Sequence, residues 1–198
     1  MDNQGSYNRG RPIGNIDPGA IAGGRDWCIR NINMGSSEVQ VDGTAPPGTV
    51  GILGTSAQCQ YTAHQFAIAS ANDYDHINIP IPNDYSPGGG MKLRVYWYSA
   101  TNHDPATHAH WVTTWRCTTP DSTTVLDAAG TAATHVDNAV PDTVNTVTYG
   151  EVTCPAAVSD VAKAGDILHI TICHDVAETH APTSVLIVVG FTLVYQRA

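Results

Sequence analysis

Charged residues are scarce in this chain of 198 residues, since they make up 14% of it, whereas about a quarter is typical of soluble domains. Nine lysines and arginines stand against 18 aspartates and glutamates, which gives a formal net charge of −9. Such a chain repels phosphate backbones, so direct binding to nucleic acid is not expected. No apolar run approaches the roughly 20 residues that a membrane-spanning helix needs, and the N-terminal residues do not resemble an export signal. A membrane partner is therefore not expected either.

The motifs of common enzymes are also missing. The sequence contains no GxSxG, no Walker glycine loop and no HExxH. The glycines Gly88, Gly89 and Gly90 precede an alternating segment rather than a helix, so they predict a turn and not a phosphate cradle. The acidic residues show no paired spacing typical of a glycosidase. We therefore expect a protein that is not an enzyme and has no cofactor.

Cysteine is present in an odd number, without a CxxC pair. This usage favours free and mostly buried thiols over disulfides or a zinc site, and it fits folding in a bacterial cytoplasm. The five positions are Cys28, Cys59, Cys117, Cys154 and Cys173.

Alternation of apolar and polar residues is what the chain has in abundance. In Met91–Ser99 the residues Met91, Leu93, Val95 and Trp97 share one face, which predicts a strand with a buried side. His110–Thr118 alternates in the same way, and we interpret the two segments as a hairpin. Further strands are expected at Trp27–Asn33, Glu38–Asp42, Val50–Leu53, Cys59–Ala69, His76–Ile81, Thr143–Cys154, Ile167–His174 and Ser184–Tyr195, with a short helical turn at Val158–Ala164 and a long connection over Asp121–Val140.

Together these segments predict an all-β fold, an antiparallel β-sandwich of jelly-roll type with an extended N-terminal arm. Residues 1–26 form the arm in this prediction, because glycines and prolines interrupt its three isoleucines, and residues 27–198 form the body. An extended arm can reach several neighbouring subunits, where guanidinium groups pair with carboxylates and isoleucines fill apolar grooves. The arm residues expected to contact a partner are Arg9, Arg11, Pro12, Ile13, Ile16 and Ile21.

Histidine is enriched, with nine residues in the chain. A bound metal is not expected, but three histidines of one loop, His103, His108 and His110, are its candidate ligands because two of them are spaced to share one side of a strand. Titration of these histidines near pH 6 is an alternative role, and simple exposure on a loop is another. The tryptophans Trp97, Trp111 and Trp115 alternate with core positions, whereas Tyr96 and Tyr98 are candidates for an outer surface.

Three segments resemble β-rich virion structural proteins of tailed bacteriophages: Pro80–Tyr98, the strand HWVTTWRC from His110, and Ala164–Tyr195. The resemblance covers about a third of the chain and consists of strand patterns. It implies that Gly165, Asp166, Asp175 and Tyr195 belong to a last hairpin of a jelly-roll-like sandwich. It also implies a capsid cement (decoration) or tail-associated subunit of a virion.

The arm favours the first of these roles. We therefore expect a structural protein of a phage virion, assembled in the host bacterial cytoplasm, that binds the major capsid protein and forms a homo-oligomer, a trimer or a dimer. The main alternative is a tail-fibre module that binds a receptor or glycan through the loops Asn102–Ala109 and Val176–Thr183. A small β-sandwich enzyme with a histidine-bound metal is a further alternative.

Overall fold

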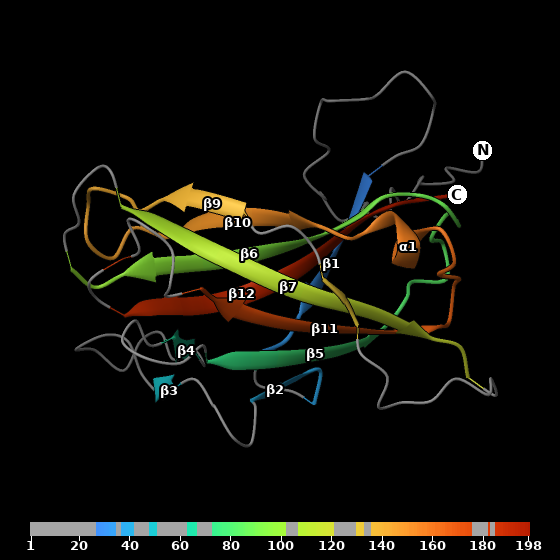
Figure 1. Cartoon of the computed structure of the whole chain (residues 1–198), viewed down its shortest axis with the longest axis horizontal. Helices are drawn as coiled ribbons and strands as arrows, with labels where there is room; N and C mark the ends of the chain where they lie inside the picture. The colour runs from blue at the N-terminus through green and yellow to red at the C-terminus, as the bar shows by residue number, and fades with distance from the viewer. Residues whose placement is uncertain are drawn as a thin grey trace, which may run out of the picture.

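The structure is a computed structural model that describes residues 27–34, 37–41, 48–50, 63–66, 73–101, 107–120, 130–132, 136–175, 182 and 185–198. These residues form strands with one four-residue helix (Figure 1). The elements are β1 (Trp27–Ile32), β2 (Val39–Val41), β3 (Gly48–Val50), β4 (Ala63–Phe66), β5 (Tyr74–Pro80), β6 (Met91–Ser99), β7 (His108–Thr118), β8 (Thr131–Ala132), β9 (Val136–Ala139), β10 (Thr148–Thr153), α1 (Ala156–Ser159), β11 (Ile167–His174) and β12 (Leu186–Gln196). The described residues contain no helix of the length and hydrophobicity required to cross a membrane.

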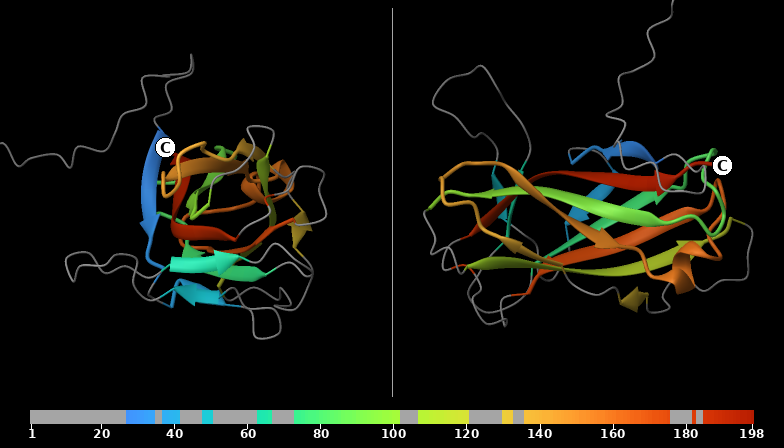
Figure 2. Two further views of the ribbon diagram at one scale, coloured as in Figure 1. Left: turned by 90° about the vertical axis from the view of Figure 1, so that its left-hand side faces the viewer. Right: turned by 90° about the horizontal axis from the view of Figure 1, so that it is seen from above.

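The strands form two antiparallel sheets that pack face to face (Figure 2). Sheet A has the order β10-β6-β12-β4-β3, with β1 also paired to β12. Sheet B has the order β2-β5-β11-β7-β8, with β9 also paired to β7. Eight of these strands, β4-β12-β6-β10 facing β5-β11-β7-β9, have the arrangement of a jelly roll. The predicted fold class is confirmed.

Two predicted hairpins are wrong. The strands β6 and β7 belong to different sheets, and so do β11 and β12, which the resemblance placed in a last hairpin. Each pair therefore faces across the core instead of sharing a ladder. The alternation of apolar and polar residues in a strand shows which of its faces is buried. It does not show whether the next strand in sequence lies beside it in the same sheet or across the core in the other sheet, because both arrangements need the same alternation.

The core lies between the inner faces of the two sheets, as the alternation predicts. Trp97 of sheet A and Trp111 and Trp115 of sheet B are fully buried, and the edge of the Phe66 ring meets Trp111 at a centroid distance of 5.5 Å. Burial of each such ring stabilises the fold by about 3 kcal/mol, and edge-to-face packing adds about 1 kcal/mol. The tryptophans therefore fix how the sheets stack.

The glycine turn before β6 confirms the prediction of a turn. Gly88 has a φ of 72°, which favours glycine, and the chain continues into a strand. At Gly90 a Cβ atom would lie 2.9 Å from the Trp27 ring, so a side chain here would push Trp27 away from the sheet. The lack of a side chain at Gly90 thus lets the first residue of β1 pack closely against the start of β6.

Residues Asp121–Val140, predicted as a connection, contain the strands β8 and β9. Both strands pair with β7, and their polar, alanine-rich sequence gives no apolar alternation to reveal them. The described cysteines Cys28, Cys117, Cys154 and Cys173 are free, as expected. Burial raises the pKa of Cys154 and Cys173 to about 12, so both thiols stay protonated.

Candidate functional site

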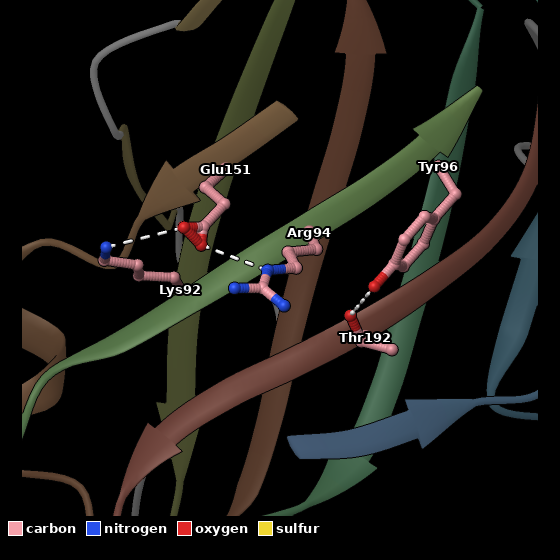
Figure 3. A network of polar contacts seen from close by, with 5 residues as sticks. All are labelled: Lys92, Arg94, Tyr96, Glu151 and Thr192. Carbon is pink, nitrogen blue, oxygen red and sulfur yellow. Dashed lines mark hydrogen bonds and ion pairs between the residues drawn. The ribbon is translucent and has the colours of Figure 1, made fainter. Parts of the chain in front are cut away.

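The outer face of sheet A carries a connected group of charged and aromatic side chains, which we call the sheet A network: Trp27, Lys92, Arg94, Tyr96, Tyr149, Glu151 and Thr192. Figure 3 shows its members Lys92, Arg94, Tyr96, Glu151 and Thr192. Strand alternation in β6 turns Lys92, Arg94 and Tyr96 away from the core, because the residues between them are fully buried. Register then places Glu151 of β10 opposite Arg94, and Tyr149 opposite Tyr96.

Glu151 links two cations of this face. Its carboxylate accepts a hydrogen bond from Nε of Arg94 at 3.1 Å and lies 3.6 Å from Nζ of Lys92. Burial opposes the charge of the Arg94 guanidinium, but the hydrogen bond and the charge of Glu151 outweigh it, so the pKa of Arg94 is raised. The charges of this face are therefore held in fixed positions.

The aromatic rings extend the network on either side of the charges. The Tyr96 and Tyr149 rings are 5.8 Å apart, and the Arg94 guanidinium lies over the Tyr149 ring at 5.0 Å. Lys92 lies over the Trp27 ring at 5.4 Å. Tyr149 remains 49% exposed. The prediction that Tyr96 belongs to an outer surface agrees with this position.

Tyr98 was expected on the same outer surface, and that expectation is wrong. It does point away from the main core, but it is only 4% exposed. It packs in a second apolar cluster with Ala63 and Ile187, against which Val189 also lies. The alternation in β6 correctly predicted the direction in which the Tyr98 side chain points. It could not show that residues of neighbouring strands cover this side chain.

The outer face of sheet B is different, because it contains a polar hollow of about 290 Å³. We call it the sheet B hollow, and its lining residues are Gln40, His76, Asn78, Thr114, Trp115, Arg116, Gly130, His169 and Thr171. Within it, Nδ1 of His169 lies 2.6 Å from Oδ1 of Asn78, and Nδ1 of His76 lies 3.1 Å from Oγ1 of Thr171. The sequence analysis did not identify this site, since its members come from four strands far apart in the chain.

A buried polar pair joins the two sheets. Nδ1 of His64, on β4, lies 2.7 Å from Oδ2 of Asp75, on β5. Burial raises the pKa of Asp75, and the hydrogen bond from His64 partly offsets that rise. The pair contributes to the link between the sheets and has no access to an outside ligand, because Asp75 is fully buried.

The structure describes only some of the predicted site residues. Arg9, Arg11, Pro12, Ile13, Ile16, Ile21 and His103 lie outside the described residues, and so does most of the two loops assigned to glycan binding. His108 and His110 both lie on β7 on the side away from the core, as their spacing predicts, and His110 is 5% exposed. No group of three or more His, Cys, Asp or Glu that could hold a metal ion occurs among the described residues. The alternative of a metal held by these histidines stays a prediction, because His103 is not among those residues.

Comparison with known proteins gives similarity of structure alone. No family model matches the sequence, and no curated protein does. A family 35 carbohydrate-binding module from Clostridium thermocellum is 11% identical, with 85% of this chain and 91% of that chain covered at a TM-score of 0.40. The K3 adhesin domain of Lys-gingipain from Porphyromonas gingivalis is 11% identical over 83% of this chain and 97% of that one, at a TM-score of 0.45. A xylan-binding domain from Paenibacillus barcinonensis is 10% identical over 87% and 86%, at 0.41. The jelly-roll assignment rests on the strand pairing of this chain itself.

Proposed function

We propose that the chain is a structural protein of a phage virion without enzymatic activity, and that it acts as a capsid cement protein that binds the major capsid protein. In this proposal sheet A is the side that faces the shell, and residues 1–26 form an arm that crosses to neighbouring subunits. Assembly takes place in the host bacterial cytoplasm, and the protein is a trimer or a dimer. The proposal rests on the sequence resemblance and on one structural feature.

That feature is the composition of the sheet A network beside the start of β1. Tyrosine, tryptophan and arginine are enriched at the centres of protein interfaces, and here all three occur on one sheet face. Trp27 contributes to the network, and residues 1–26 precede it in the chain. An arm that ends just before Trp27 joins the body at the same face, so the two elements can act on one partner.

Particle fractionation tests the proposal. We expect the full-length chain to copurify with intact heads, and purified chain to rebind heads from which it has been removed. Tyr149→Ala should weaken rebinding by about tenfold or more, because an exposed aromatic anchor is lost. Val161→Ala is the matched control, since Val161 is 63% exposed, follows α1 and is not a member of the network. Copurification with tails or with neither fraction contradicts the proposal.

Removal of residues 1–26 addresses the arm separately. We expect the truncated chain to keep the near-ultraviolet circular dichroism of its buried tryptophans and to lose head binding. Undiminished binding by the truncated chain contradicts a role for the arm, while loss of binding by Tyr149→Ala alone assigns the contact to sheet A.

The second candidate function is binding of a glycan, as in a receptor-binding module of a tail fibre. The observation that favours it is the polar sheet B hollow, which is unlike the charged and aromatic face of sheet A. A glycan array with the purified full-length chain separates the two functions, since a cement protein has no need to bind sugars.

A further inference from the structure

The hollow on sheet B is built as two rows of polar side chains that cross the strands. Strand register aligns Gln40 of β2, His76 of β5, Thr171 of β11 and Thr114 of β7 in the first row. A second row aligns Asn78 of β5, His169 of β11 and Arg116 of β7. With strands about 4.8 Å apart, the first row extends over about 14 Å.

One wall of the hollow depends on a glycine. Gly130 precedes β8, and a Cβ atom there would lie 2.5 Å from Cγ2 of Thr114 and 2.9 Å from the main-chain oxygen of Trp115. The chain can pass this close to β7 only without a side chain. This close approach limits the hollow on the β8 side of the sheet.

The imidazole of His169 contains an unsatisfied acceptor in the second row. The carbonyl oxygen of Asn78 can only accept, so Nδ1 of His169 donates to it. Burial, together with the charge of Arg116, lowers the pKa of His169, which keeps the ring neutral and its Nε2 an acceptor. Nε2 is buried and has no hydrogen-bond partner in the structure. A hydroxyl group supplied by a ligand would satisfy it once neighbouring side chains move aside.

The chemistry of the lining limits what can bind. It consists of amides, hydroxyls and imidazoles, and Trp115 points into the core, where it is fully buried. The strands β5, β11 and β7 have strand neighbours on both sides, so their main chain is not open to an added peptide strand. Among the lining residues Arg116 has the one permanent charge, and none of them is a carboxylate. A ligand rich in hydroxyl groups and with a negative charge fits this surface best.

We propose that the sheet B hollow binds an oligosaccharide that contains a carboxylated sugar. The hydroxyl groups bond to the polar rows, with one donated to Nε2 of His169, and the carboxylate lies beside Arg116, whose guanidinium suits a planar anion. The proposal rests on the second candidate function, glycan binding, and assigns to it a site and a ligand class.

The test compares variants of the full-length protein. An array of neutral and carboxylated oligosaccharides identifies a ligand, and calorimetry measures its affinity. Arg116→Gln should weaken binding of the carboxylated ligand by about tenfold or more, and Gln40→Ala, at the exposed end of the first row, should weaken it less. Thr153→Val on sheet A is the matched control and should bind as the unmodified protein does, because Thr153 is exposed on the opposite face.

Each outcome has a defined meaning. If the unmodified protein binds no carboxylated oligosaccharide, or if the affinity is unchanged in both Arg116→Gln and Gln40→Ala, the proposed site is wrong. If a glycan binds and Tyr149→Ala alone abolishes the binding, glycan binding stands but belongs to sheet A. Head rebinding by Arg116→Gln, measured in parallel, should stay at its normal level, so the cement proposal stands or fails independently.

Discussion

The outer face of sheet A and the inner face of sheet B hold their ionisable groups in opposite ways. Sheet A places Lys92, Arg94 and Glu151 on its outer face, where water and neighbouring charges compensate them, and its buried His64 pairs with Asp75 of sheet B. Sheet B directs Asp75 and His174 into the core, where they are at most 1% exposed. The outer charges of sheet A are thus inexpensive to alter, whereas the buried titratable groups of sheet B are tied to stability.

The comparison also bears on the partners proposed for the two outer faces. On sheet A, the cations already have Glu151 as a partner, so a protein proposed to cover this face would not have to neutralise them. On sheet B, Nε2 of His169 lacks a partner, which favours a ligand that brings hydrogen bonds of its own.

The largest expected effect follows from breaking the link between the sheets. His64→Ala removes the partner of Asp75 and leaves a buried carboxyl group without its hydrogen bond, so we expect a loss of about 3 kcal/mol or more in the free energy of unfolding. Urea denaturation followed by tryptophan fluorescence measures it. His64→Gln, which retains a donor, should lose less. A loss under about 1 kcal/mol for His64→Ala would mean that the pair does not stabilise the sandwich.

An effect of similar or smaller size is expected from acid and should come from sheet B. Burial and the neighbouring His110 lower the pKa of His174 to about 4, against the opposing charge of Asp175. In the unfolded chain the ordinary value near 6.5 returns, so this stability is complete above about pH 6.5 and is lost as the pH falls toward 4, by roughly 3 kcal/mol in total.

His174→Phe isolates that contribution. A phenyl ring can keep the edge contact that His174 makes with Trp111, and it cannot take up a proton. The unmodified protein should therefore lose more stability than the variant between pH 6.5 and pH 4.5 in urea denaturation. If the free energy of unfolding changes with pH equally in the two proteins, His174 does not take up a proton when the chain unfolds, and the prediction is wrong.

Much of the fold follows from the sequence because strand alternation records burial directly. The predicted Met91–Ser99 and Ile167–His174 agree with β6 and β11 at both ends. The assignment of strands to sheets does not follow, since β6 faces β7 across the core although their patterns would suit a hairpin equally well. Sheet membership is decided by long-range pairing that one strand does not encode.

The candidate sites were harder to predict. Lys92, Arg94 and Tyr96 could be placed on one face from alternation in β6, but Glu151, which links the cations, is 57 residues from Arg94. The sheet B hollow joins Gln40 to Thr171 through register across three strands. Neither arrangement produces a local sequence motif. The histidine cluster of His103, His108 and His110 indicated a site in a different part of the chain.

The smallest expected effect concerns the outer charges of sheet A. Glu151→Gln leaves Lys92 and Arg94 as neighbouring cations without their shared carboxylate, but all three side chains have contact with water. We expect a loss below about 1 kcal/mol in the free energy of unfolding, and a smaller loss at high salt because salt screens the repulsion. Urea denaturation at low and high salt measures both, with Asp142→Asn, the same change of charge at an exposed position, as the control. A loss above about 2 kcal/mol, independent of salt, would mean that the charges of sheet A are as tied to stability as those of sheet B, and the contrast between the two layers would fail.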